Sequence, residues 1–255
     1  LVGSDLCIRD RYIRCGMSKV LFFSGAGLSA DSGLGVFRGS GGMWDKYDIK
    51  QVCYINTWER NYDLVHEFYS KRRIEYAKAE PNLMHKTIAD LQNRYGEDRV
   101  IVITQNVDNL LEKAGCTKVL HVHGHINYIH CVDCGLEKRI EGEFKGEKCE
   151  KCGGVKFKPS IVFFGEQAPN YYPMYMAFDS LTSYDAVAVI GTEGSVVPIG
   201  QIIGSRSSGV PAKRFLCNLE KSHYINAADF DKVIYDRAEN AADEARSFAE
   251  DVLKG

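Results

Sequence analysis

The stretch Ser24–Gly39, SGAGLSADSGLGVFRG, decides the fold that this sequence predicts. It follows Val20–Phe23, a short apolar run typical of a buried strand. Small residues after such a strand let backbone N–H groups approach a phosphate, and a following helix adds partial positive charge. The stretch therefore indicates a phosphate-binding turn. Because Gly25-Ala26-Gly27 is shorter than the full glycine-rich fingerprint, an ordinary tight turn is the alternative.

Composition limits the class of protein. The chain has 255 residues and a mass of 28.6 kDa, which suits one α/β domain with insertions or two small domains. Its net charge of −2 offers no basic field that would attract nucleic acid or a membrane surface. We find no apolar run approaching the ~18 residues of a membrane span and no secretory signal sequence. We expect residues 1–16, before Met17, to be a leader of uncertain origin.

Strand-like and helix-like stretches alternate along the chain. Short apolar runs predict strands at Val20–Phe23, Val100–Ile103, Val119–Val122, Ile161–Phe164, Ala186–Ile190 and Arg214–Asn218. Apolar residues at spacings of three and four predict helices at Thr57–Ala79, His85–Tyr95, Asp108–Ala114 and Ala241–Leu253. Continuous apolar runs are typical of strands covered on both faces, so we predict a doubly wound parallel α/β sheet.

Two Cys-x-x-Cys pairs lie in a segment with few apolar residues, from about Ile126 to Pro159. Four thiolates close a tetrahedral coordination sphere, so these pairs predict one structural zinc ion bound by Cys131, Cys134, Cys149 and Cys152. A redox dithiol or unpaired thiols are the alternative. The pattern favours a reducing compartment, and we expect a cytoplasmic protein. We expect His130 at the surface, and buried or incidental thiols at Cys7, Cys15, Cys53, Cys116 and Cys217.

Polar side chains follow two of the predicted strands. Gln105–Asp108 comes directly after a buried strand, where amide and carboxylate groups can bind a carboxamide and ribose hydroxyls. An N-cap role before the next helix is the alternative. His123 follows another strand, and an imidazole there can act as a base near neutral pH. A structural histidine is the alternative, since His121 and His125 stand on either side.

Tyr69 and Arg72 are three residues apart on a predicted helix, so they share one face. Together they would bind a carboxylate through a phenol hydroxyl and a guanidinium. A solvated basic helix is the alternative, because Lys71 and Arg73 adjoin Arg72.

The order of these motifs resembles the sirtuins, the NAD-dependent protein deacylases. The resemblance spans about Lys19 to Ala238 and is carried by GAG-x-S-x-x-SG-x-x-x-FRG from Gly25, TQNVDNL from Thr104, His123-Gly124, both cysteine pairs, FFGE from Phe163, GT-x-x-x-VVP from Gly191 and NLE from Asn218. It implies a Rossmann-like NAD-binding domain at 17–44, 86–125 and 160–255, and a smaller domain. The smaller domain would join a helical module at 45–85 to a zinc-ribbon insertion at 126–159.

The resemblance also implies roles for single residues. His123 would be the general base, and Asn106 would hold the nicotinamide end of NAD together with Asp108. NAD would contact Gly25, Ala26, Gly27, Ser29, Phe37, Arg38, Trp44, Gln105, Asn106, Val107, Asp108, Gly191, Thr192, Glu193, Asn218, Leu219, Glu220 and Ala238. Substrate would contact Val162, Phe163, Phe164 and Gly165, with the Val162 carbonyl accepting from the lysine Nε–H and the segment pairing with the peptide backbone as a strand.

The family reaction converts NAD and an acyl-lysine protein into nicotinamide, O-acyl-ADP-ribose and free lysine. Tyr69 and Arg72 resemble the subclass that accepts succinyl and malonyl groups, so we expect these acyl groups as well as acetyl. The partners would be acyl-lysine proteins or peptides, with no nucleic acid and no membrane. For the FFGE segment, the alternative to a substrate-binding role is a plain core strand that ends in a glycine turn.

Three residues depart from the family pattern: Gly35 replaces a proline, Leu111 replaces a histidine, and Glu193 replaces a serine. The Glu193 carboxylate would stand near the pyrophosphate and repel it. Two other functions therefore stay open: an NAD hydrolase or ADP-ribosyltransferase on the same scaffold, or an NAD-binding module whose catalysis Glu193 impairs.

Overall fold

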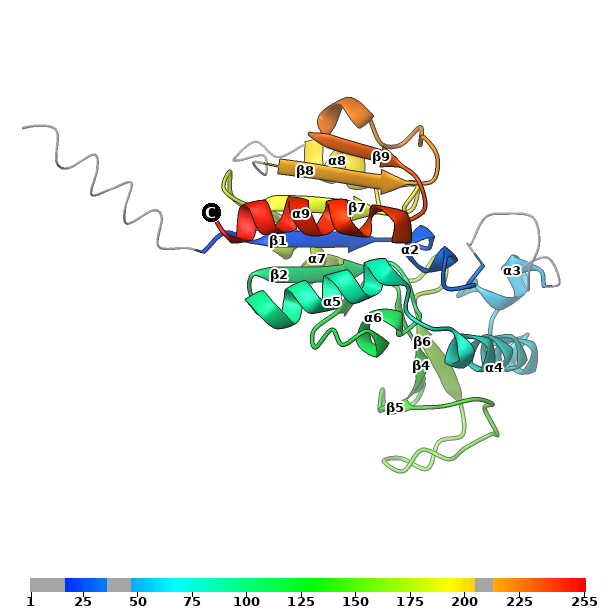
Figure 1. Cartoon of the computed structure of the whole chain (residues 1–255). Helices are drawn as coiled ribbons and strands as arrows, with labels where there is room; N and C mark the ends of the chain where they lie inside the picture. The colour runs from blue at the N-terminus through cyan, green and yellow to red at the C-terminus, as the bar shows by residue number, and fades with distance from the viewer. Residues whose placement is uncertain (1–16, 36–46, 205–212) are drawn as a thin grey trace, which may run out of the picture.

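The computed structural model describes residues 17–35, 47–204 and 213–255 (Figure 1). Several sequence predictions lie outside the described residues: the leader at 1–16, Cys7, Cys15, Phe37, Arg38 and Trp44. No helix in the described part of the chain combines the length and apolar composition needed to cross a bilayer.

A six-stranded parallel sheet is the centre of the fold, with strand order β3-β2-β1-β7-β8-β9. Its strands are β1 (Val20–Ser24), β2 (Val100–Thr104), β3 (Leu120–His121), β7 (Ala186–Ile190), β8 (Lys213–Asn218) and β9 (Lys232–Tyr235). The chain adds β2 and β3 on one side of β1, then returns to add β7 on the other. The strand order therefore reverses between β1 and β7, which is where ligands bind in open α/β sheets.

Alternate residues of each central strand face opposite layers of helices. In β1, Val20 and Phe22 face the layer of α5 (Leu83–Tyr95) and α9 (Ala242–Leu253), which lie together in front of the sheet (Figure 1). Leu21 and Phe23 face α7 (Tyr171–Asp179) and α8 (Ile199–Gly204). Burial on both faces explains why β1, β2 and β7 are apolar along most of their length.

A smaller antiparallel sheet, of order β5-β4-β6, extends away from the large sheet (Figure 1). It consists of β4 (Gly124–Cys131), β5 (Glu137–Arg139) and β6 (Phe157–Ile161). Two helices, α3 (Ile49–Val52) and α4 (Tyr62–Lys78), form a helical segment. This segment shares a separate apolar core with Ile126, Ile161 and Phe163. The His66 ring on α4 stacks on Phe144 with centroids 3.9 Å apart, so α4 also supports the cysteine-rich insertion.

The predicted fold class is confirmed, but several element limits are wrong. The strand predicted at Ile161–Phe164 ends at Ile161, because Phe163 N–H donates to the Glu166 side chain and Phe164 pairs with Tyr54. The helix predicted at Thr57–Ala79 begins at Tyr62, after a run of turns. Sequence analysis did not predict α7 or α8. The remaining short elements are α2 (Gly27–Ala30), α6 (Leu110–Lys113), η2 (Ala227–Asp229) and η3 (Glu239–Ala241).

Candidate active site

A cleft of about 950 Å³ opens at the carboxyl ends of β1, β2, β7 and β8. The loops after these strands form one wall, and α4 with the segment after β6 forms the other. Residues from both sheets and from the helical segment thus meet in one cavity, at the point where the strand order reverses.

The loops after β1 and β7 pack directly against each other. The Gly27 N–H donates to the Gly191 carbonyl at 2.9 Å, and the Gly25 N–H donates to Ile190 at 3.0 Å. A Cβ on Gly27 would lie 2.7 Å from the Gly191 Cα, and Gly191 itself has a φ of +62°. These glycines are therefore needed for close backbone packing. The N–H groups of Gly25 and Gly27 are used within the protein, to hold these two loops together.

Ser29 connects the first loop to the loop after β2. Its hydroxyl donates to Asp108 Oδ2 at 2.9 Å and accepts from Asn106 Nδ2 at 3.0 Å. Asp108 Oδ1 accepts the Leu110 N–H at 3.0 Å, but the N-cap of α6 is Asn109, whose side chain makes no cap hydrogen bond. Burial raises the pKa of Asp108, and the Ser29 and Leu110 donors oppose that rise. The network fixes the side chains of Asn106 and Asp108 at the cleft wall.

A second network joins the loops after β2, β7 and β8. The Asn218 side chain accepts from the Thr192 N–H and donates to the Thr192 carbonyl, both at 2.9 Å. Gln105 Nε2 donates to the Thr192 hydroxyl at 2.8 Å. Glu193 is exposed on the same loop, and its carboxylate accepts from the Ser195 hydroxyl at 3.0 Å.

His123 lies between β3 and β4, at the joint between the two sheets, and lines the cleft. Its Nδ1 lies 3.2 Å from the Gln105 carbonyl, and its Nε2 lies 3.0 Å from the Tyr171 hydroxyl. Burial lowers the pKa of His123, with the Gln105 carbonyl opposing, so the imidazole is neutral at pH 7. A neutral imidazole in a cleft can accept a proton.

The two flanking histidines differ from His123. His121 bridges the Asn106 carbonyl and the Glu112 carboxylate, each at 2.7 Å. Burial opposes its charge, but the hydrogen bond to Glu112 and the charge of that carboxylate raise the pKa of His121 overall. His125 accepts the Asn127 N–H through Nδ1, and burial lowers its pKa to about 4. Of the three, only His123 lines the cleft.

Tyr69 and Arg72 are both buried, at 3% and 5% exposure, and both line the cleft. The solvated-helix alternative is therefore wrong for Arg72, although Lys71 is exposed. The Tyr69 ring stacks on Phe163 at 5.8 Å, and its hydroxyl lies 3.5 Å from Cys53 Sγ. Burial lowers the pKa of Arg72, but from a value so high that the guanidinium stays charged at neutral pH.

The FFGE turn is held by an ion pair between the buried Lys158 and the half-buried Glu166. Glu166 Oε2 accepts the Phe163 N–H at 2.8 Å and lies 2.9 Å from Lys158 Nζ, whose side chain is only 4% exposed. The Phe164 N–H donates to Cys53, and its carbonyl accepts from Ile55. An added peptide strand therefore cannot use Phe164, which narrows the pairing expected from the sequence.

The four paired cysteines converge, with all four sulfurs within 4.8 Å of one another. The Cys131–Cys152 and Cys134–Cys149 sulfurs lie 3.6 and 3.5 Å apart. Zinc–sulfur bonds of ~2.3 Å in a tetrahedron place sulfurs about 3.8 Å apart, so the cluster fits a structural zinc ion. No cleft-lining residue belongs to the cluster.

Most of the remaining predicted residues line the cleft: Ala26, Val107, Val162, Gly165, Leu219 and Glu220. Ala238 does not; it is buried in the core beneath α9. Sequence analysis missed Cys53, Tyr76, Tyr171, Ser195 and Lys221, which also line the cleft. Ser195 and Lys221 adjoin motifs already recognised, whereas Tyr171 is on the unpredicted helix α7 and carried no sequence signal.

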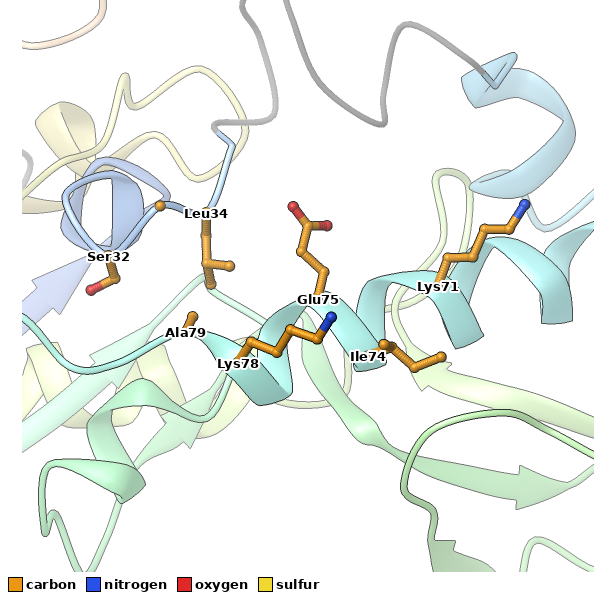
Figure 2. Close-up of a pocket in the computed structure, with 8 residues that line it drawn as sticks. Ser32, Leu34, Lys71, Ile74, Glu75, Lys78 and Ala79 are labelled. Carbon is orange, nitrogen blue, oxygen red and sulfur yellow. The ribbon is translucent and has the colours of Figure 1, made fainter.

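A second hollow, of about 500 Å³, lies between the Ser32–Leu34 turn and the outer side of α4 (Figure 2). Lys71, Glu75 and Lys78 of α4 line it together with Leu34 and Ala79. It contains none of the predicted site residues, so we assign the candidate site to the larger cleft.

Comparisons with known proteins agree with this site. The Sir2 family model matches residues 25–198. The NAD-dependent protein deacylase of Helicobacter hepaticus is 43% identical over 235 residues, covering 86% of this chain and 92% of the relative. The NAD-dependent protein deacylase of Campylobacter jejuni strain RM1221 is 36% identical over 244 residues, covering 93% and 98%.

A crystal structure of a Sir2 homologue in complex with NAD has a TM-score of 0.77 and 27% identity, covering 92% of this chain and 91% of that one. The family model and the two relatives extend over most of the chain. The chain belongs to the Sir2 family.

Proposed function

We propose that this chain is an NAD-dependent protein-lysine deacylase. The observation that carries the proposal is the neutral His123 imidazole in the same cleft as the networked Asn106 and Asp108 side chains. NAD supplies the ribose carbon that takes the acyl oxygen, and nicotinamide leaves it. The chain belongs to the family of relatives named for this activity.

Each residue of the site has its own role in this proposal. Asn106, oriented by Ser29, presents its amide to the nicotinamide end, and Asp108 accepts hydrogen bonds there. His123 accepts a proton from a ribose hydroxyl through Nε2, the nitrogen that does not face the Gln105 carbonyl. The Val162 carbonyl accepts from the lysine Nε–H. Loops after β1, β7 and β8 enclose the rest of NAD.

We propose further that the acyl pocket accepts a terminal carboxylate, as in succinyl and malonyl groups. Tyr69 and Arg72 lie on one face of α4, are buried, and line the same cleft as His123 and Asn106. The Arg72 guanidinium lies 4.8 Å from the Tyr76 ring centre, so aromatic groups hold it in place. A carboxylate there can accept a charge-assisted hydrogen bond from Arg72. An acetyl group has no terminal carboxylate for these side chains to bind.

Nicotinamide release tests the function against its alternatives. We expect release that depends on an acyl-lysine peptide. Release without peptide would indicate an NAD hydrolase, and transfer of ADP-ribose to a protein acceptor would indicate an ADP-ribosyltransferase. No release with retained NAD binding would indicate an impaired binding module.

Acyl selectivity has its own test. A charge-assisted hydrogen bond contributes roughly 1.5–3 kcal/mol, so kcat/KM should favour succinyl over acetyl lysine at least about tenfold on one peptide. Arg72→Met should remove this preference and leave deacetylation nearly unchanged. Lys71→Met, at the neighbouring exposed position, is the matched control and should change neither rate. Equal rates on both peptides in the unaltered protein would contradict the proposal.

A further inference from the structure

Tyr171 is a residue of the cleft that neither the sequence motifs nor the family resemblance singled out. It is the first residue of α7, and its hydroxyl lies 3.0 Å from His123 Nε2. The start of α7 is tied to β3, the strand that precedes His123, because Asn170 Nδ2 donates to the His121 carbonyl at 2.8 Å. Met174 and Phe178 are fully buried against the sheet, so the helix holds Tyr171 in a fixed place.

The partners of His123 determine which nitrogen carries its proton. A carbonyl oxygen only accepts, so the contact between Nδ1 and Gln105 requires a proton on Nδ1. In the neutral ring Nε2 then holds the lone pair, and the Tyr171 hydroxyl donates to it. Burial raises the pKa of Tyr171, with Tyr175 adding to the rise, so the phenol keeps the proton that it donates.

We propose that Tyr171 is a positioning residue for His123: its hydroxyl and the Gln105 carbonyl hold the imidazole at two points, so that Nε2 faces the cleft that Tyr171 also lines, and a ribose hydroxyl would take the place of the phenol at the Nε2 lone pair. A single contact at Nδ1 would leave the ring free to rock, and a flip about χ2 would replace Nε2 with carbon. The role in catalysis rests on the proposed function of His123 as base. The contact between the Tyr171 hydroxyl and His123 Nε2 does not depend on that function.

The phenol also suits both protonation states of the histidine. It donates to the neutral ring, and after proton transfer its oxygen accepts from the imidazolium Nε2–H. The imidazolium is the more acidic donor, and a hydrogen bond from a charged donor is the stronger of the two, so the net effect of the hydroxyl favours the imidazolium. Losing the hydroxyl should therefore lower the pKa of His123.

Other charged groups near His123 also influence its pKa. Asp108 and Glu193 lie on the loops after β2 and β7, Glu166 on the turn before α7, Lys221 after β8, Arg72 on α4, and Glu112, His121 and His125 beside the strand ends. All of them are retained in the variants below, so a change in the titration of His123 reports on the altered hydroxyl.

Two measurements on the full chain test the proposal. The first is NMR titration of His123, assigned with His123→Asn; the second is the pH dependence of kcat/KM with NAD and an acetyl-lysine peptide. Tyr171→Phe should lower the pKa of His123 by roughly 0.5–1 unit and move the acid limb of kcat/KM equally, because the difference between the two hydrogen bonds is worth about that much. Tyr172→Phe, the 73% exposed neighbour on α7, should move neither.

A second substitution covers the case in which Tyr171→Phe is unstable. With 3-fluorotyrosine at position 171 the ring is kept and the phenol is more acidic, so stronger donation should lower the pKa of His123. An unchanged His123 titration in both variants overturns the proposal whatever the activity does. A shifted titration without a shift of the acid limb refutes His123 as the base, and with it the catalytic role of Tyr171.

Discussion

The two sheets of this protein are stabilised in different ways. Among the described residues, the two apolar layers on the large sheet contain 24 and 14 buried side chains. The small sheet has a cluster of five, two of which are the zinc-site cysteines Cys131 and Cys149. The large sheet is held by apolar burial, whereas the insertion lacks enough apolar area to fold alone. The candidate active-site cleft needs both sheets, because His123 lies where they join.

Loss of the metal should have the largest effect, since it removes one of the two regions. We expect one zinc ion per chain, and we expect Cys149→Ser to lose it and unfold residues 126–159, because structural zinc contributes about 10–16 kcal/mol to folding in small domains. Activity should fall with it, since β6 of the small sheet leads directly into Val162, whose N–H donates to the His123 carbonyl at the cleft. Metal analysis and limited proteolysis measure both effects.

Cys116→Ser is the control for that substitution. Its thiol is buried in the core of the large sheet, away from the zinc cluster. This variant should keep its zinc and the protection of the insertion even if it is less stable. Full activity of Cys149→Ser, or a purified chain without zinc, would contradict the distinction between the two sheets.

The next largest effect should come from the residue at the joint. His123→Ala should lower kcat about 10²–10⁴-fold, the usual contribution of a general base, while both sheets stay folded. In the unaltered protein kcat/KM should fall as pH drops through the pKa of His123, which burial holds below its ordinary value of 6.5. Steady-state rates and circular dichroism on the same preparation separate chemistry from folding.

The neighbouring histidines sharpen this test. His125→Ala should change the rate little, because His125 does not line the cleft. His121→Ala should act on stability, by breaking the bridge from Asn106 to Glu112. Since the pKa of His121 is raised on folding, its stabilising contribution is complete below about pH 6.5 and is lost as pH rises through the raised value. A larger loss of kcat in either variant than in His123→Ala would refute the assignment of the base.

The sequence predicted the central strands β1, β2 and β7 well because they are buried on both faces and therefore consist of nearly unbroken apolar runs. It did not predict the edge strand β9, whose residues are exposed or half-buried. It also predicted the zinc cluster, since ligand spacing is local. It failed where tertiary contacts decide: Ile161–Phe164 is apolar, yet Glu166 and Cys53 bind its backbone and end the strand. Helix α7 was missed for a related reason, because its buried residues, Met174 and Phe178, are few and its exposed face is aromatic.

The smallest expected effect is that of substituting Glu193. This residue lies on the loop after β7, so its substitution affects only the side of the cleft that the large sheet forms. We expect Glu193→Ser to tighten NAD binding about fourfold. Two unit charges ~5 Å apart in water repel by about 0.8 kcal/mol, and a stronger effect requires the low dielectric of a buried site. Glu193 is exposed, and Ser195 donates to its carboxylate, so screening limits the repulsion. Isothermal titration of NAD at low and high salt measures the gain in affinity, which should shrink as the salt concentration rises.

Glu220→Ser is the matched comparison, because Glu220 is an exposed carboxylate of the same cleft on the loop after β8. If both variants bind NAD as the unaltered protein does, at every salt concentration, then the Glu193 carboxylate turns away from the pyrophosphate.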